Sequence, residues 1–267
     1  MKDKRVLCVS SEVVPYLPDT EMARMSFETA RMVHGNGGQT RIFMPRFGLI
    51  NERRHQLHEV IRLSGMNMII NDMDMPLIIK VASIPKERMQ VYFIDNEEYF
   101  KRKATFTDDK GNLFEDNDER MIFFAKGVVE TVKKLNWAPD IIHVHGWMAA
   151  LLPIYLKEYY KDDALFANSK IVTSIYNNEF DGTLNNELVN KLSFDNIEKS
   201  DSIKIANHSN LLKIAIENSD AIITGSENID TDLVEYAKSL DKPVLDFYPE
   251  DDFKDAYMNF YQTKVLQ

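Results

Sequence analysis

Short apolar runs alternate with longer segments of helical periodicity along most of the chain. The apolar runs are bounded by polar turns and are too short for helices, which favours buried strands. Strands are predicted at residues 5–10, 40–44, 140–145, 170–175 and 220–224. The segments between them carry apolar residues at helical spacing, and helices are predicted at residues 21–34, 118–135, 147–160, 207–218 and 227–240.

A second group of elements is predicted in the first hundred residues. Residues 76–82 and 88–94 have the composition of two strands in a sheet or hairpin, separated by a short turn. Residues 51–63 carry apolar residues on one side and are predicted as a helix. These elements extend the pattern without interrupting it.

Two segments stand apart from the alternation of strands and helices. Residues 101–118 are polar and rich in Asp and Lys, which is typical of a surface excursion. Residues 251–267 are predicted as a terminal helix that packs back on the domain through Phe253, Tyr257 and Phe260.

Strands that alternate with helices imply right-handed crossovers and a mainly parallel sheet. The consecutive apolar residues Ala221, Ile222 and Ile223 suit a strand that is covered on both faces. No internal repeat or Gly/Ser linker divides the chain. Residues 1–267 are therefore predicted as a single α/β domain with a Rossmann-like, doubly wound sheet and helices on both of its faces.

Composition narrows the class of protein. The 267 residues include 32 Lys and Arg against 42 Asp and Glu, a net charge of −10, which argues against binding nucleic acid through its phosphates. One cysteine excludes an intramolecular disulfide. The first apolar run is too short for a signal peptide, and no run approaches the length that spans a bilayer. We expect a cytoplasmic protein without a membrane segment.

Polar turns follow four of the predicted strands, at residues 10–12, 143–147, 176–179 and 224–226. In an open α/β sheet, ligands bind beyond the carboxyl ends of the strands, so these turns are expected to line a cleft. The first strand-to-helix connection contains no glycine, although a phosphate-binding loop needs glycine for close approach of its N–H groups. A dinucleotide cofactor is therefore not expected.

Two histidines and the cysteine invite more than one interpretation. His143 and His145 are two residues apart at a strand end, so they share one face and could form a metal pair. No acidic third ligand lies at a suitable spacing, and the alternative is one histidine packed in the sheet and one at its rim. Cys8 lies in an apolar strand and is expected to be a buried small hydrophobe. No metal site is predicted.

The segments at these strand ends also match a known family. Residues 6–15 (VLCVSSEVVP) resemble the first strand and Ser-Glu-x-x-Pro turn of bacterial glycogen synthases and plant starch synthases. Residues 140–147 (DIIHVHGW) are similar to their Pro-Asp-apolar-apolar-His-x-His-Asp-Trp motif, and residues 170–182 and 211–226 follow two later motifs in the correct order. These synthases are retaining glucosyltransferases that use ADP-glucose. The resemblance implies the N-terminal half of a two-domain glycosyltransferase-B architecture.

Several motif positions depart from the family. Its first turn continues as Lys-x-Gly-Gly-Leu-Ala-Asp, which the resemblance implies contacts donor and acceptor. In this chain the lysine and both glycines are absent, and two carboxylates stand where a diphosphate would lie, which weakens donor binding electrostatically. We therefore expect a degenerate donor loop at Pro18, Asp19, Thr20 and Glu21.

The remaining departures affect the sugar site that the resemblance implies. Gly146 stands at the Asp of His-x-His-Asp-Trp, Met148 at the His that follows this motif, and Tyr176 at the His of Val-His-Asn. Tyrosine donates a hydrogen bond and stacks on a sugar, but it does not replace an imidazole. Trp147 has two interpretations, a stacking platform for a sugar or a core residue. No residue is assigned as catalytic, and the candidate sugar cleft consists of Glu12, His143, His145, Trp147, Tyr176 and Asn177.

Three hypotheses about function follow. Family members are about twice as long, and we expect their nucleotide-binding C-terminal domain to be absent here, so the first hypothesis is a non-catalytic domain of α-glucan (glycogen) metabolism. It would bind an α-glucan or a synthase-type protein partner, and it needs no cofactor. The alternative is an active ADP-glucose:α-1,4-glucan glucosyltransferase, alone or completed by a second chain, with ADP-glucose as donor. The third is a structural or assembly protein, and the sequence does not determine its oligomeric state.

Overall fold

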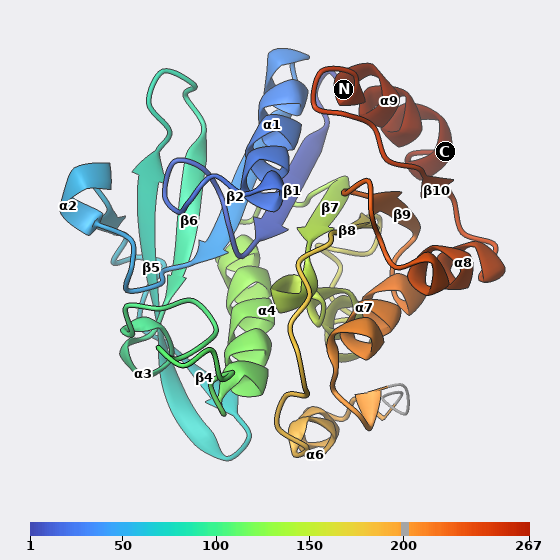
Figure 1. Cartoon of the computed structure of the whole chain (residues 1–267). Helices are drawn as coiled ribbons and strands as arrows, with labels where there is room; N and C mark the ends of the chain where they lie inside the picture. Colours follow the sequence, from blue (N-terminus) through green and yellow to red (C-terminus); the bar gives the residue numbers. More distant parts are fainter. Residues whose placement is uncertain (199–202) are drawn as a thin grey trace.

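A mostly parallel sheet of ten strands forms the centre of the molecule (Figure 1). The computed structural model describes residues 1–198 and 203–267. Seven strands run parallel in the spatial order β10-β9-β8-β7-β1-β2-β6. Their bounds are Arg5–Ser10 (β1), Gln39–Pro45 (β2), Gln90–Asp95 (β6), Ile141–His145 (β7), Lys170–Ile175 (β8), Ala221–Thr224 (β9) and Val244–Leu245 (β10). The five strands predicted from isolated apolar runs are confirmed.

Antiparallel strands extend the sheet beyond β6. Strand β5 (Met73–Ser83) pairs with β6 as the predicted hairpin, and β3 (His58–Glu59) and β4 (Met66–Ile70) both pair with β5. Strand β4 was not predicted, because its sequence MNMII is short and its methionines suit both helix and strand. The sheet therefore ends in the antiparallel strands β3, β4 and β5, on the side of α2 (Figure 1).

Helices cover both faces of the parallel region. On one face, Ser26 of α1 (Glu21–Gly35) donates to Ser10 of β1 at 2.9 Å, and α9 (Phe253–Phe260) lies beside α1 (Figure 1). On the other face, Gly127 of α4 (Asn117–Lys134) packs against Ile94 of β6. The remaining α-helices of the described residues are α2 (Glu52–His55), α3 (Glu97–Phe100), α5 (Leu152–Ile154), α6 (Leu188–Phe194), α7 (His208–Glu217) and α8 (Thr231–Ser239). A 3-10 helix, η1 (Trp147–Ala149), and two π-helical turns, η2 (Tyr155–Tyr159) and η4 (Tyr261–Val265), join them.

The prediction of one helix over residues 51–63 is wrong. Only α2 is helical in this range, and it ends where Gln56 adopts a left-handed conformation with φ of 53°. No residue of α2 is buried, and Ile61, one of the predicted apolar positions, is 84% exposed, so the apolar face that would stabilise a longer helix is incomplete. The chain turns instead into β3, which is hydrogen-bonded to β5.

The terminal helix and the excursion both contact the core. Phe253, Tyr257 and Phe260 are buried, as predicted for residues 251–267. Within residues 101–118 the stretch 108–112 is exposed, while the ring of Phe106 packs 4.7 Å from that of Trp147. The excursion is therefore anchored at its base. Among the described residues, no helix is both long and apolar enough to cross a membrane.

Candidate functional site

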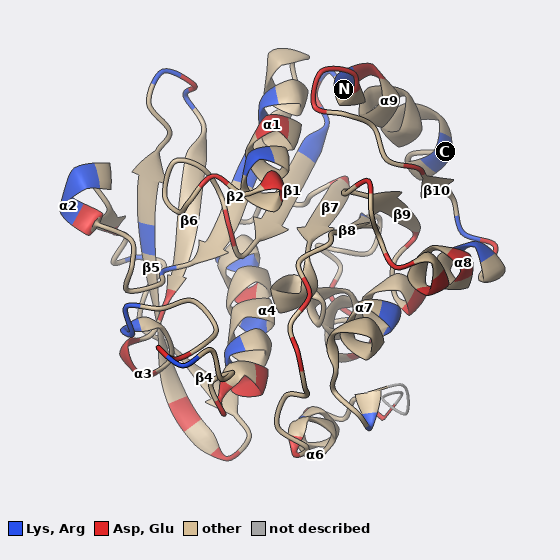
Figure 2. Ribbon diagram, in the orientation of Figure 1, with Lys and Arg blue, Asp and Glu red and all other residues tan. Residues whose placement is uncertain are grey.

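The carboxyl ends of four neighbouring strands form one edge of the sheet. Because β9, β8, β7 and β1 are adjacent and parallel, the polar turns that follow them converge, as the sequence predicts. The register places Ser10 beside His145 and His145 beside Ser174. Figure 2 shows acidic positions at the start of α1 and along the loop that leaves β8, so this edge is negatively charged.

His143 and His145 are stacked in the core at this edge. Their ring centroids are 4.0 Å apart, and both side chains are completely buried. His143 forms hydrogen bonds with Ser174 Oγ at 2.7 Å and with the hydroxyl of Tyr261 at 2.5 Å. His145 Nδ1 lies 2.8 Å from the hydroxyl of Tyr176. The sequence did not indicate the contact with Tyr261, which comes from η4, 118 residues further along the chain.

Burial keeps both imidazoles neutral. It lowers the pKa of His145 to about 3, and it lowers the pKa of His143 well below the usual value, with a further contribution from His145. The pKa of the Tyr176 hydroxyl is raised, mainly by burial. The Cys8 thiol lies on the same face, and burial raises its pKa to about 12, so it stays protonated. The two histidines and Tyr176 are therefore neutral and hydrogen-bonded at neutral pH, and the Cys8 thiol is uncharged.

The stability of the fold should fall as the pH is lowered from about 6.5 towards 3. An unfolded histidine binds a proton near pH 6.5, whereas His145 and His143 in the fold do not, so acid favours the unfolded chain. Each such histidine contributes a slope of about 1.4 kcal/mol per pH unit within its window. Urea unfolding between pH 7 and 5, above the range of ordinary carboxylates, measures the summed slope, to which His208 also contributes because burial lowers its pKa to about 4.

Two variants separate the buried pair from other histidines. In His143→Gln the slope between pH 7 and 5 should be shallower than in the parent, because one buried imidazole is gone. The exposed His34 is the matched control, and His34→Gln should leave the slope unchanged. Unfolding midpoints that do not change over this pH range would refute the neutral buried pair.

Tyr176 closes the edge beyond the histidines. Its side chain is 3% exposed, and a Cβ placed on Gly225 would lie 2.5 Å from its ring. The next residue, Asn177, is exposed and its backbone N–H donates to Ser226 Oγ at 3.1 Å. Trp147 is buried between the rings of Phe106 and Phe180, so it is a core residue here.

The four residues of the predicted donor loop lie exposed at the beginning of α1. Thr20 is the N-cap of this helix: its hydroxyl accepts from Ala23 N at 3.1 Å and donates to Glu12 Oε2 at 2.5 Å. Glu21 accepts a hydrogen bond from Ser226. A helix N-terminus attracts anions, and here carboxylates of the chain itself already lie at it. Burial raises the pKa of the half-buried Glu12, a shift that the bond from Thr20 opposes.

Gly146, at the position of the motif's Asp, has a backbone conformation and surroundings that favour glycine. Its φ is 72°, and a Cβ added to it would lie 2.4 Å from Met22 Sδ. The Asp expected from the resemblance therefore does not fit at this position while Met22 occupies the space.

The structure brings part of the candidate cleft together and buries the rest. Within the described ranges, no group of three His, Cys, Asp or Glu side chains could hold a metal ion. His143, His145, Trp147 and Tyr176 are in the core, whereas Glu12 and Asn177 reach the surface. The cleft itself stays a prediction. The polar partners at this edge that the sequence did not single out as contacts are Ser174, Ser226 and Tyr261.

Comparison with known proteins identifies the family. The sequence model of the starch synthase catalytic domain matches residues 5–243. The chain is 37% identical over 227 residues to a glycogen synthase of Chlorobium luteolum, covering 85% of this chain and 46% of that protein. It is 35% identical over 246 residues to a glycogen synthase of Chlorobaculum tepidum, covering 91% and 49%. The chain thus spans about half the length of the curated relatives that it matches.

A solved structure has the same fold. The catalytic domain of starch synthase IV from Arabidopsis thaliana, bound to ADP and acarbose, superposes with a TM-score of 0.70 at 17% identity. The match covers 92% of this chain and 51% of that one, so the fold is that of about half of the larger structure. The predicted Rossmann-like fold is confirmed. The family match over residues 5–243 shows that this chain belongs to the starch synthase catalytic domain family.

Proposed function

We propose that this chain does not transfer glucose by itself and acts in α-glucan metabolism by binding an α-glucan or a synthase-type protein partner. Its membership of the family supports a role in α-glucan metabolism. The observation that carries the non-catalytic part is the start of α1, where Glu12 accepts from the N-cap Thr20 and Glu21 accepts from Ser226, while Asp19 is paired with Arg24.

The charge at this edge opposes an anionic donor. A nucleotide-sugar diphosphate brought to the N-terminus of α1 would meet Glu12 and Glu21, which already accept hydrogen bonds from Thr20 and Ser226. Repulsion between like charges at close range disfavours that complex. A neutral glucan carries no such charge, and its hydroxyls can donate to carboxylates and to Asn177.

The buried histidines and Tyr176 also argue against transfer. Retaining transfer needs hydrogen-bonding groups aimed at the reacting sugar in a closed cleft. His143 and His145 are instead hydrogen-bonded to Ser174, Tyr176 and Tyr261 within the core. An active glucosyltransferase, alone or completed by a second chain, is the second candidate, and the identity to glycogen synthases favours it.

Transfer of labelled glucose from ADP-glucose to glycogen tests the proposal directly. We expect the purified chain to give no incorporation above background, with an intact glycogen synthase as positive control. The chain should nevertheless co-sediment with glycogen, and Asn177→Ala, which changes an exposed side chain at the edge, should reduce this retention. Incorporation that is lost in Tyr176→Ala would establish the enzyme instead. No incorporation and no retention would leave the protein partner as the remaining form of the proposal.

A further inference from the structure

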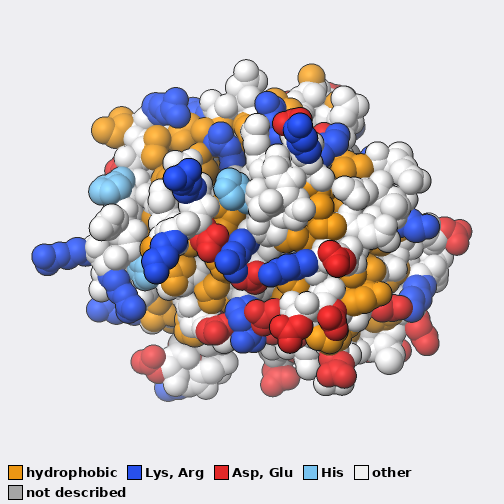
Figure 3. Space-filling view, turned by 90° about the horizontal axis from the view of Figure 1, so that it is seen from above, with side chains coloured by type: hydrophobic (Ala, Val, Ile, Leu, Met, Phe, Trp, Pro, Cys, Tyr) orange, Lys and Arg blue, Asp and Glu red, His pale blue; other side chains and the backbone are white. Residues whose placement is uncertain are grey.

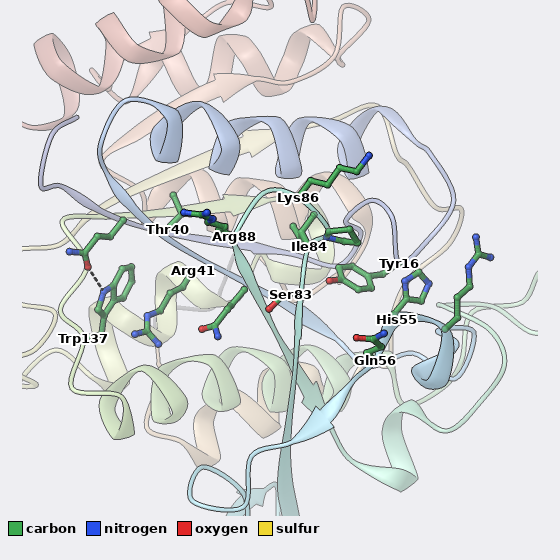
Figure 4. A pocket seen from close by; sticks show the side chains of 14 residues that line it. Tyr16, Thr40, Arg41, His55, Gln56, Ser83, Ile84, Lys86, Arg88 and Trp137 are labelled. Carbon is green, nitrogen blue, oxygen red and sulfur yellow. Dashed lines mark hydrogen bonds between the residues drawn. The ribbon is translucent and has the colours of Figure 1, made fainter.

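A pocket of about 840 Å³ lies outside the candidate sugar cleft. It is formed where the first turn after β1, the start of β2, α2 and the turn between β5 and β6 meet (Figure 4). Its volume is in the range of small-molecule sites. It shares no residue with the candidate sugar cleft or the donor loop.

The pocket is basic in a chain whose net charge is −10. The described residues that line it include no Asp or Glu, and the cations among them are Arg41, Arg54, Lys86 and Arg88. None of these four forms an ion pair within residues 1–198 and 203–267. The neighbouring carboxylate of Glu87 is paired with Arg31 of α1. Figure 3 shows Lys and Arg side chains, with histidines among them, gathered on the side of the molecule where β6 and α2 lie.

Arg41 marks one end of this pocket. Its guanidinium lies over the rings of Tyr92 and Trp137 and donates to the Tyr92 hydroxyl at 2.7 Å. Burial lowers the pKa of Arg41, and the nearby cations Arg5 and Arg62 contribute in the same direction. A half-buried cation among other cations gains most from an anion that binds beside it.

Two buried hydroxyls in the pocket have no hydrogen-bond partner within the described residues. They belong to Tyr16 and Thr40, which come from different elements. The Tyr16 side chain is 5% exposed, its ring contacts those of His55 and Phe93, and its hydroxyl points into the pocket (Figure 4). Burial raises the pKa of this hydroxyl, so it remains a hydrogen-bond donor. Buried hydroxyls normally have a partner, so this pair indicates a ligand with acceptor oxygens.

The backbone holds the two cations of the β5–β6 turn in an uncommon conformation. Lys86 and Arg88 have φ of 70° and 56°, in the left-handed region that side chains other than glycine rarely occupy. The turn is closed by a hydrogen bond from Ile84 N to Met89 O at 2.9 Å. Both cationic side chains are thereby carried on one tight turn at the pocket.

We propose that this pocket binds a small phosphate monoester. The phosphate lies beside Arg88 and accepts a hydrogen bond from the hydroxyl of Thr40, which is on the same side of the pocket (Figure 4). The hydroxyl of Tyr16, on the other side, donates to an oxygen of the organic part. The organic part, for which the volume leaves room, packs against the rings of Tyr16 and His55. This inference does not depend on the proposed function at the sheet edge.

Calorimetric titration of the full chain with glucose 1-phosphate and with AMP tests this site. At least one of them should bind at millimolar concentration or below, and its unphosphorylated counterpart, glucose or adenosine, should bind at least about tenfold more weakly. Binding should weaken with added salt. Failure of both monoesters to bind, or equal binding of the unphosphorylated counterparts, would overturn the proposal. Inorganic phosphate that binds as tightly as both esters would contradict the role of the organic part.

Matched variants locate the binding within the pocket. Arg88→Gln should weaken binding about tenfold, since a hydrogen bond between charged groups is lost. Arg54→Gln, on a different element, gives an independent reading if the strained turn does not tolerate the first substitution. Lys101→Gln changes an exposed cation outside the pocket and should have no effect. Binding that is unchanged in both arginine variants would place the ligand elsewhere.

Tyr16→Phe separates recognition from folding. The hydroxyl that it removes has no partner in the described chain, so the variant should fold and be at least as stable as the parent to heat. It should nevertheless bind the monoester several-fold more weakly. A variant with unchanged affinity would show that this hydroxyl does not contact the ligand and would contradict the proposed arrangement.

Discussion

Replacing Asp195 by alanine is expected to lower the free energy of unfolding by about 3–5 kcal/mol, the largest stability effect expected for this chain. The Asp195 carboxylate, just after α6, lies 2.8 and 2.9 Å from Lys126 Nζ of α4, and both side chains are buried. It also accepts from the hydroxyl of Tyr155 at 2.7 Å. Without it, the ammonium of Lys126 remains buried without a carboxylate, and its remaining contacts are the carbonyl of Ile69 and the ring of Tyr159.

Urea unfolding followed by circular dichroism measures this loss. The double variant Lys126→Met/Asp195→Leu removes both charges and should recover most of the stability, because apolar side chains replace a buried ion pair at little cost. The matched control is Lys101→Met, which breaks the exposed pair with Glu97 and should change stability by less than about 1 kcal/mol. If Asp195→Ala were as mild as this control, the pair would have no structural importance.

Gly225→Ala is expected to lower the free energy of unfolding by about 2 kcal/mol through overpacking. The added Cβ would lie 2.5–2.9 Å from three atoms of the Tyr176 ring. This ring cannot swing away freely, because its hydroxyl is bonded to His145 in the core. Thermal or urea unfolding of the single variant measures the effect. Gly35→Ala, which meets no atom within 4 Å, is the control and should cause no loss.

A double-mutant cycle shows whether Gly225 and Tyr176 depend on each other. In the Tyr176→His background, the smaller ring leaves room, so adding Gly225→Ala should cost much less than it does in the parent chain. Gly225 occupies the variable position of the Thr-x-Ser run in the resemblance, and Tyr176 occupies the position of its histidine. Equal costs in both backgrounds would show that the two departures are independent.

Much of the fold could be predicted because its signals are local. Helix 118–135 was expected from one apolar stripe, and the structure has it at Asn117–Lys134. The prediction of a helix over residues 51–63 was wrong because the spacing of apolar residues indicates neither the left-handed conformation of Gln56 nor the pairing of β3 with β5. Strand β4 was missed for a related reason, since its pairing with β5 decides its conformation.

The sites were harder to predict than the elements. The order of the strands brings the polar turns together, but spacing does not reveal that Tyr261 covers His143. Whether a histidine is a ligand or a core residue depends on this kind of distant contact. The basic pocket combines Tyr16, Thr40 and Arg88 from three separate segments, none of which forms a motif. None of these residues stands out in the sequence, and only the folded structure shows that they line one cavity.

The position of α9 and η4 in the chain also has a consequence for biosynthesis. These helices follow every strand of the described sheet in sequence, yet they cover the face that holds His143 and Cys8. A ribosome therefore delivers the strands before the segment that shields them, and the nascent sheet exposes this face to water in the meantime. Exposed apolar surface on such intermediates promotes aggregation, so the growing chain is most prone to aggregate during this interval.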